Sequence, residues 1–288
     1  MIKAVVDEVL KEMENATNEG IKEVDDYMDT ETGLLMCGQC HTKKQKKLSF
    51  LGEERVVGCL CRCAAEKLEK ERARHEAEEN LMHIQQMKSA GLQDRTFYGY
   101  TFERCDTSQE NAIYAKRYVE HFSEIMQAGQ GLLFWGNVGT GKTFLAGCIA
   151  NALLEKKIPV LMTSFPKILN ALRGLYSAER NEYLASLNRY TLLVIDDMGI
   201  ERDTQYTLET VYTVIDERYK SGKPFIITTN IQLDILGNPQ DLEHARIYDR
   251  IMERCMPVFF GGKNYRSELG QGNRDTAKKI LTGLNDTV

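Results

Sequence analysis

The chain has 288 residues, of which 42% are hydrophobic and 27% charged, with a formal net charge of −5. This composition is ordinary for a globular protein, and the length suits one large domain or one medium domain with a smaller partner. The acidic balance excludes a protein that is basic throughout and coats nucleic acid, but it is compatible with a local basic patch. No apolar run approaches the roughly 20 residues of a membrane span, and the N-terminus lacks the features of a signal peptide. We therefore expect a cytoplasmic protein without a membrane partner.

The first third of the chain differs from the rest. Residues 1–31 are strongly acidic, and the apolar Val5, Val6, Leu10 and Met13 fall at helical spacing. Residues 64–88 carry mixed charges with pairs at i and i+4, a pattern typical of a long helix with a solvated surface. We expect this second helix to end near Gly91.

A cysteine cluster lies between the acidic stretch 1–31 and the charged stretch 64–88. Five of the eight cysteines occur between residues 37 and 63, as Cys37-Gly-Gln-Cys40 and Cys59-Leu-Cys61-Arg-Cys63. In a reducing compartment such a cluster indicates a metal site before it indicates disulfides. Four thiolates at this spacing can close a tetrahedral Zn²⁺ site, and a segment of about 30 residues has too little core to fold without such a link. The intervening chain suits a small β-hairpin, and His41 is a sixth candidate ligand.

From about residue 110 onward, helical patterns alternate with short apolar strands. This alternation predicts an α/β fold in which helices cover both faces of a parallel sheet. The expected helices span 109–127, 142–156, 166–186 and 204–221, and the expected strands span 132–135, 160–163, 192–195 and 225–229.

A phosphate-binding loop follows the first of these strands. The segment Gly136-Asn137-Val138-Gly139-Thr140-Gly141-Lys142-Thr143 matches G-x-x-x-x-G-K-[ST] between a strand and a helix. Its glycines allow the backbone N–H groups to converge on phosphate oxygens, and the helix N-terminus favours negative charge there. We expect Lys142 to contact the β- and γ-phosphates of ATP and the Thr143 hydroxyl to bind Mg²⁺.

Two later strands also end in polar residues. The run Leu192–Ile195 is followed by Asp196 and Asp197, at the sheet edge where α/β proteins bind ligands. We expect Asp196 to hold Mg²⁺ through water and Asp197 to polarise the attacking water. Asn230 follows the strand 225–229 and either orients that water or serves as a turn residue.

Four segments carry a resemblance to a known family: GNVGTGKT, LLVIDDMGIER, FIITTN and ARIYDRIMERC. Together they resemble the AAA+ branch of P-loop ATPases. The closer similarity is to bacterial or phage replicative helicase loaders of the DnaC and DnaI type, and to the related IstB-like ATPases that assist transposition. The resemblance covers roughly residues 95–266 and implies a five-stranded parallel sheet between helices. It also implies that the segment Tyr100–Glu103 lies near the adenine.

The resemblance further implies an arginine finger on ARIYDRIMERC, with Arg250 the better match and Arg246 the second candidate. A finger acting on a neighbouring subunit implies self-association in the ATP state. The C-x-C before the charged helix is similar to phage-type loaders, which favours Cys37, Cys40, Cys61 and Cys63 as zinc ligands and leaves Cys59 as the alternate.

Three regions are expected from the resemblance. Residues 1–90 would form a zinc-binding module with helices that contacts a hexameric replicative helicase, residues 91–266 an AAA+ ATPase domain, and residues 267–288 a tail too short for a helical lid domain. Single-stranded DNA would contact basic segments such as Lys43–Lys47 and Lys263–Arg266. Hydrolysis is expected to be slow and regulatory, because many AAA+ ATPases carry Glu at the position of Asp197. An IstB-like transposition helper, or an adaptor that binds ATP without turnover, is the alternative.

Overall fold

The computed structural model describes residues 22–50, 53–105, 109–200, 204–239 and 241–282. The helix expected around Val5, Val6, Leu10 and Met13 therefore falls outside the described residues. The chain divides into two compact units, Met1–Met82 and His83–Val288.

The first unit contains two small antiparallel sheets. Strand β1 (Tyr27–Met28) pairs with β2 (Leu35–Met36), and β3 (Gln45–Phe50) pairs with β4 (Glu53–Gly58). The second pair confirms the predicted hairpin between the two cysteine groups. Residues 22–31 of the acidic stretch form turns and β1.

Helix α2 (Arg62–Gly91) starts within the second cysteine group, and Gly91 is its single buried residue. A Cβ atom on Gly91 would lie 2.1 Å from the carbonyl oxygen of Val160, so only glycine permits this close approach. The predicted charged helix is thus confirmed, and it ends at the predicted residue.

The second unit is built on one five-stranded sheet. It consists of β5 (Gly131–Gly136), β6 (Val160–Ser164), β7 (Leu192–Met198), β8 (Phe225–Thr229) and β9 (Cys255–Phe260). All neighbouring strands are parallel, in the order β6-β7-β8-β5-β9. The parallel sheet confirms the predicted α/β fold, and its carboxyl edge gathers the ends of β5, β7 and β8.

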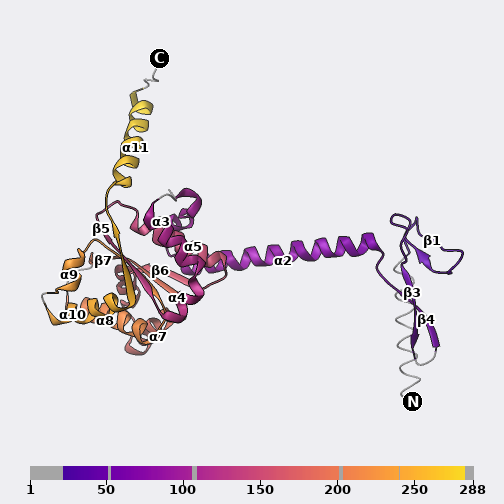
Figure 1. Cartoon of the computed structure of the whole chain (residues 1–288), viewed down its shortest axis with the longest axis horizontal. Helices are drawn as coiled ribbons and strands as arrows, with labels where there is room; N and C mark the ends of the chain where they lie inside the picture. The colour runs from indigo at the N-terminus through magenta and orange to yellow at the C-terminus, as the bar shows by residue number, and fades with distance from the viewer. Residues whose placement is uncertain (1–21, 51–52, 106–108, 201–203, 240, 283–288) are drawn as a thin grey trace. The chain divides into compact units, whose positions relative to one another are not determined.

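Helices cover both faces of this sheet (Figure 1). Alternate side chains of a strand point to opposite faces, so Phe134 enters the core beside α3 (Glu110–Glu120) and α5 (Lys142–Glu155). Its neighbour Leu133 enters a second core beside α6 (Phe165–Leu172), α8 (Gln205–Lys220) and α10 (Leu242–Arg254). The near-continuous apolar character of the strands follows from this burial on both faces.

Some element boundaries differ from the sequence-based expectation. The single helix expected over 166–186 is wrong, because the chain forms α6 and α7 (Ser177–Leu187), separated at Gly174 with φ of 79°. The helix expected over 109–127 is likewise divided at His121 into α3 and α4 (Phe122–Ala128).

Four further elements were not predicted. Three are short: the 3₁₀ helices η1 (Arg95–Gly99) and η2 (Phe102–Arg104), and helix α9 (Leu233–Gly237). The fourth is the 18-residue helix α11 (Tyr265–Thr282), which covers most of the expected tail. Among the described residues, none of the helices combines the length and apolarity that crossing a bilayer requires.

Candidate functional site

The phosphate-binding loop joins β5 to α5, as the motif predicts. Gly136, Gly139 and Gly141 have φ values of 126°, 80° and 96°, a region that residues with a Cβ rarely adopt. At Gly139 a Cβ atom would also lie 2.1 Å from the Oδ1 atom of Asn264. The loop conformation therefore depends on glycine at these positions.

Lys142 lies at the centre of the loop, and its ammonium group is held by three acceptors. Nζ donates to the carbonyl oxygens of Gly136 at 2.9 Å and Asn137 at 2.7 Å, and to Oδ1 of Asn230 at 2.7 Å. Burial lowers the pKa of Lys142, while the charge of Asp197 opposes this shift. A desolvated ammonium group held by neutral oxygens is suited to exchange them for phosphate oxygens.

The end of β7 supplies a buried carboxylate. Oδ1 of Asp196 accepts a hydrogen bond of 2.7 Å from Oγ1 of Thr228 on the neighbouring strand β8. Burial raises the pKa of Asp196, and the hydrogen bonds from Thr228 and Thr143 partly offset this effect. The hydroxyl of Thr143 and the carboxylate of Asp196 thus lie together, and such oxygens are the ligands that Mg²⁺ takes beside substrate phosphates.

Asp197 has an unusual backbone conformation. Its φ is 52°, and the pairing of β7 with β8 is irregular between Ile195 and Met198. The Asp197 amide donates a 2.8 Å hydrogen bond to Oγ1 of Thr228, so this one buried hydroxyl bridges both acidic residues. Asp197 also lines the cavity beside the phosphate-binding loop. Sequence reasoning assigned no role to Thr228, because a threonine in a buried strand gives little signal by itself.

A cavity of about 640 Å³ opens beside the loop, a size common for small-molecule sites. The predicted residues Lys142, Thr143, Asp197 and Asn230 all line it. Tyr100, expected near the adenine, also lines it, with its ring 5.1 Å from the ring of Phe144 between centroids. Gln109, Tyr265 and Arg266 also line the cavity. The sequence-based prediction did not place them at this site, and it assigned the segment Lys263–Arg266 to DNA contact instead.

The two candidate finger arginines differ in their surroundings. The Arg250 guanidinium lies 2.8 Å from Oδ1 of Asp216, hydrogen-bonds the Tyr212 hydroxyl at 3.1 Å, and stacks over the rings of Tyr212 and Tyr219. The side chain of Arg246 is exposed and has no ion pair among the described residues. Arg250 is therefore engaged within its own chain, while Arg246 is available to a neighbour.

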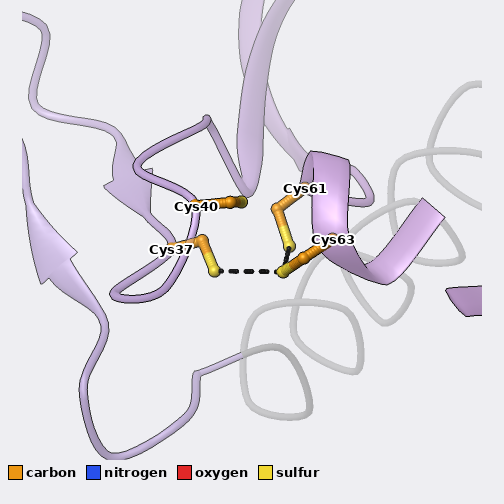
Figure 2. Close-up of side chains that lie close together, drawn as sticks. All are labelled: Cys37, Cys40, Cys61 and Cys63. Carbon is orange, nitrogen blue, oxygen red and sulfur yellow. Dashed lines mark hydrogen bonds between the residues drawn. The ribbon is translucent and has the colours of Figure 1, made fainter. Parts of the chain in front are cut away.

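In the first unit, four of the candidate cysteines come together: Cys37, Cys40, Cys61 and Cys63 (Figure 2). All four sulfur atoms lie within 4.8 Å of one another. The Cys63 sulfur is 3.6 Å from that of Cys37 and 3.3 Å from that of Cys61.

Two other candidate ligands have different partners. Cys59 directs its sulfur to the carbonyl oxygen of Lys43 at 3.5 Å. Nδ1 of His41 lies 3.2 Å from the Tyr27 hydroxyl. Of the six candidates, the structure thus gathers only the four that the resemblance favoured.

This cysteine cluster has the geometry and chemistry of a tetrahedral metal site. Four sulfurs about 2.3 Å from a zinc ion are roughly 3.8 Å apart, close to the separations found here. The hydrogen bond with Cys61, followed by those with Cys40 and Cys37, raises the pKa of Cys63 to about 12. Four crowded thiols cannot all ionise unless a cation offsets their repulsion. The cluster therefore fits a structural zinc ion.

A P-loop beside a strand that ends in two acidic residues, on a five-stranded parallel sheet covered by helices, defines an ATP-binding protein of the AAA+ class. The chain belongs to the family of IstB-like ATP binding proteins, whose family model matches residues 46–271. This match confirms the resemblance and the fold class.

Two curated relatives are named as replicative helicase loaders. DnaI of Bacillus subtilis is 28% identical over 194 residues, covering 62% of this chain and 62% of that protein. DnaC of Escherichia coli K12 is 28% identical over 181 residues, covering 62% of this chain and 71% of that protein. A crystal structure of DnaI superposes with a TM-score of 0.50 at 25% identity, covering 60% of this chain and 93% of that one. The chain thus spans less than two thirds of the length of the Bacillus relative.

Proposed function

We propose that this protein is an ATP-dependent loader that binds a hexameric replicative DNA helicase and delivers it to single-stranded DNA. The observation that carries the proposal is the convergence of Lys142, Asp197 and Asn230 in one cavity of a chain with loader relatives. Because these relatives are named as helicase loaders, the loader hypothesis has more support than the transposition alternative.

In this proposal the site binds and slowly hydrolyses ATP. Lys142 moves from its three neutral acceptors to the β- and γ-phosphates. Thr143 and Asp196 would hold Mg²⁺, and the bound ion would neutralise charge on the phosphates. Asp197 polarises the attacking water, and Asn230, once released from Lys142, orients it. In this proposal Lys142 exchanges its hydrogen bond with Asn230 for phosphate contacts when ATP binds.

A neighbouring subunit would complete the site with an arginine. Charge develops on the γ-phosphate in the transition state, and a guanidinium from the adjacent subunit offsets it. The contacts of Arg250 with Asp216 and Tyr212 support Arg246 as the residue that reaches the neighbour. Self-association in the ATP state follows from this arrangement.

The three expected regions remain part of the proposal: residues 1–90 for helicase contact, 91–266 for ATP, and 267–288 as a tail. Within the basic run 43–47, Lys44 is buried and pairs with Asp26 at 2.5 Å, so its charge is satisfied internally. The exposed Lys43, Lys46 and Lys47 are left as candidate contacts to DNA phosphates. Lys263 pairs with Glu268 at 2.7 Å and is a weaker candidate.

The test is a loading assay on closed circular single-stranded DNA, with the purified full chain, ATP and a hexameric bacterial replicative helicase. We expect loading by the wild type, loss with Lys142→Ala, and loss of helicase capture with Cys37→Ser. Lys278→Ala, an exposed change on α11, serves as the matched control. If the wild type neither captures the helicase nor promotes its loading in any nucleotide state, the loader assignment is wrong.

A further inference from the structure

Helix α5, which begins at Lys142 of the phosphate-binding loop, holds the segment of chain that contains η1. The side chain of Asn151 in this helix is only 1% exposed, and its Nδ2 donates to the carbonyl oxygens of Phe97 at 2.7 Å and Tyr100 at 3.0 Å. Nδ2 also lies 3.1 Å from the carbonyl oxygen of Gly147, one turn earlier in the same helix. One buried side chain therefore fixes the backbone of η1 to α5.

A close contact at Gly147 brings Tyr100 directly onto the same face of α5. A Cβ atom on Gly147 would lie 2.6 Å from Cδ2 of Tyr100, so glycine permits an approach that a larger residue would block. The Tyr100 ring also lies 5.1 Å from the ring of Phe144 between centroids. Residues spaced three and four apart share one face of a helix, so Phe144, Gly147 and Asn151 form a single stripe. Tyr100 lies against this stripe and lines the cavity beside the phosphate-binding loop.

Two residues of the stripe are unfavourable for the stability of a buried helix. Glycine in a helix interior is less stable than alanine. Oδ1 of Asn151 is buried and has no hydrogen-bond partner among the residues that the structure describes, and an unpaired buried acceptor destabilises a protein. Residues that break local rules in this way are expected at functional sites. Here both of them contact Tyr100.

We infer that Asn151 and Gly147 are positioning residues, which place the Tyr100 ring against the base of a nucleotide bound in this cavity. The inference rests on the proposed ATP site and concerns its nucleoside end. The phosphate end depends on the loop and on Lys142, about two and a half turns before Asn151 along α5. Changes at Asn151 and Gly147 should therefore weaken binding of the nucleoside and leave binding of the phosphates intact.

The test measures, by calorimetry with Mg²⁺ present, the dissociation constants of the full chain for ATP and for inorganic tripolyphosphate, which has no base. The wild type should bind ATP more tightly. Tyr100→Ala should raise the constant for ATP about 5- to 100-fold, the usual effect of removing an aromatic ring from a base. Asn151→Ala and Gly147→Ala should each raise it about 3- to 30-fold, because the ring is displaced but still present. For tripolyphosphate, all three variants should stay within about twofold of the wild type.

Two comparisons distinguish positioning from a general effect on folding. In a chain that already carries Tyr100→Ala, the change Asn151→Ala should have little further effect on ATP binding, because Asn151 acts through that ring. Thr163→Val is the matched control. Thr163 is also buried, and its hydroxyl donates a 2.8 Å hydrogen bond to Oε1 of Gln93, outside the cavity. This variant should bind both ligands like the wild type, and thermal melting establishes that each variant is folded during the measurement.

Lys142→Ala separates the ATP site from the inference about Tyr100. This variant should lose both ligands, and if it binds them like the wild type, the proposed ATP site is wrong. If it loses both while Asn151→Ala and Gly147→Ala keep wild-type ATP affinity, or weaken ATP and tripolyphosphate equally, the ATP site stands and the inference is overturned. Equal affinities of the wild type for ATP and tripolyphosphate would also overturn it.

Discussion

Replacing Thr228 by valine removes one buried hydroxyl and changes little else. Valine has nearly the same shape and the same preference for a strand. In the wild type this hydroxyl donates to Asp196 at 2.7 Å and accepts from the Asp197 amide at 2.8 Å. The substitution therefore disconnects both acidic residues from β8 without creating a cavity.

The expected loss of stability follows from these two bonds. A hydrogen bond to a charged group contributes about 1.5–3 kcal/mol and a neutral one about 0.5–1.5 kcal/mol. A total near 3 kcal/mol lowers the melting temperature of a unit of this size by roughly 6–12 °C. The substitution also raises the pKa of Asp196 further, because the bond from Thr228 favours the ionised form. Asp197 loses the contact that supports its left-handed backbone.

Activity should fall for a separate reason. With Asp196 more often protonated, half-saturation by Mg²⁺ should require more Mg²⁺, and raising the pH should partly restore it. Phosphate release at saturating Mg²⁺ should drop at least tenfold, because Asp197 is no longer held in place. Both quantities are measured at a temperature where the variant is folded, as judged by thermal melting.

Thr229→Val is the matched control. Thr229 is equally buried and also uses its hydroxyl twice, donating to the Met198 carbonyl at 2.8 Å and accepting from the Ile231 amide at 3.1 Å. We expect a loss of about 2 kcal/mol in stability with a smaller effect on Mg²⁺ dependence. Equal losses of turnover in the two variants, or an unchanged Mg²⁺ requirement in Thr228→Val, would refute the proposed role of the bridging hydroxyl.

Three further predictions concern the cysteine cluster, the arginines and pH. The purified wild-type chain should contain one zinc ion, which Cys61→Ser should lose and Cys59→Ser should retain. Zinc analysis measures this directly. Zinc in both variants would contradict the assignment, and so would a wild type and two variants that all lack zinc. Arg246→Ala should reduce ATP turnover at least tenfold while leaving the melting temperature within about 2 °C, whereas Arg250→Ala should lower the melting temperature, because its ion pair and aromatic stacking are lost. Burial alone would raise the pKa of Asp216, but the hydrogen bond from Lys220 and the charges of Arg250 and Lys220 hold it below its usual value. Its stabilising effect should therefore be complete above about pH 4 and disappear as the pH falls through the lowered pKa, so urea unfolding of wild type and Asp216→Asn should differ at pH 7 and converge near pH 2.

Much of the site could be predicted from the sequence, because most of its functional residues lie in short contiguous segments. The loop 136–143 encodes its own conformation, since its glycines permit the backbone turns and the lysine is adjacent in sequence. The acidic pair 196–197 could be placed because parallel strands of one sheet end at a common edge. The cysteines could be grouped by spacing, although spacing alone could not choose between Cys59 and Cys61.

Contacts between segments that are distant in the chain could be found only from the tertiary structure. Thr228 meets Asp196 across 32 positions, and Gln109 meets Tyr265 across 156. Neither pair carries a local pattern, because strand order and helix packing bring the partners together. The sequence alone determined that a P-loop and a cysteine cluster exist, since short-range backbone conformation and ligand spacing suffice for both. Arg266 lines the cavity, and Arg250 forms an ion pair with Asp216 of the same chain. Both positions depend on packing between distant segments, which no local sequence motif predicts.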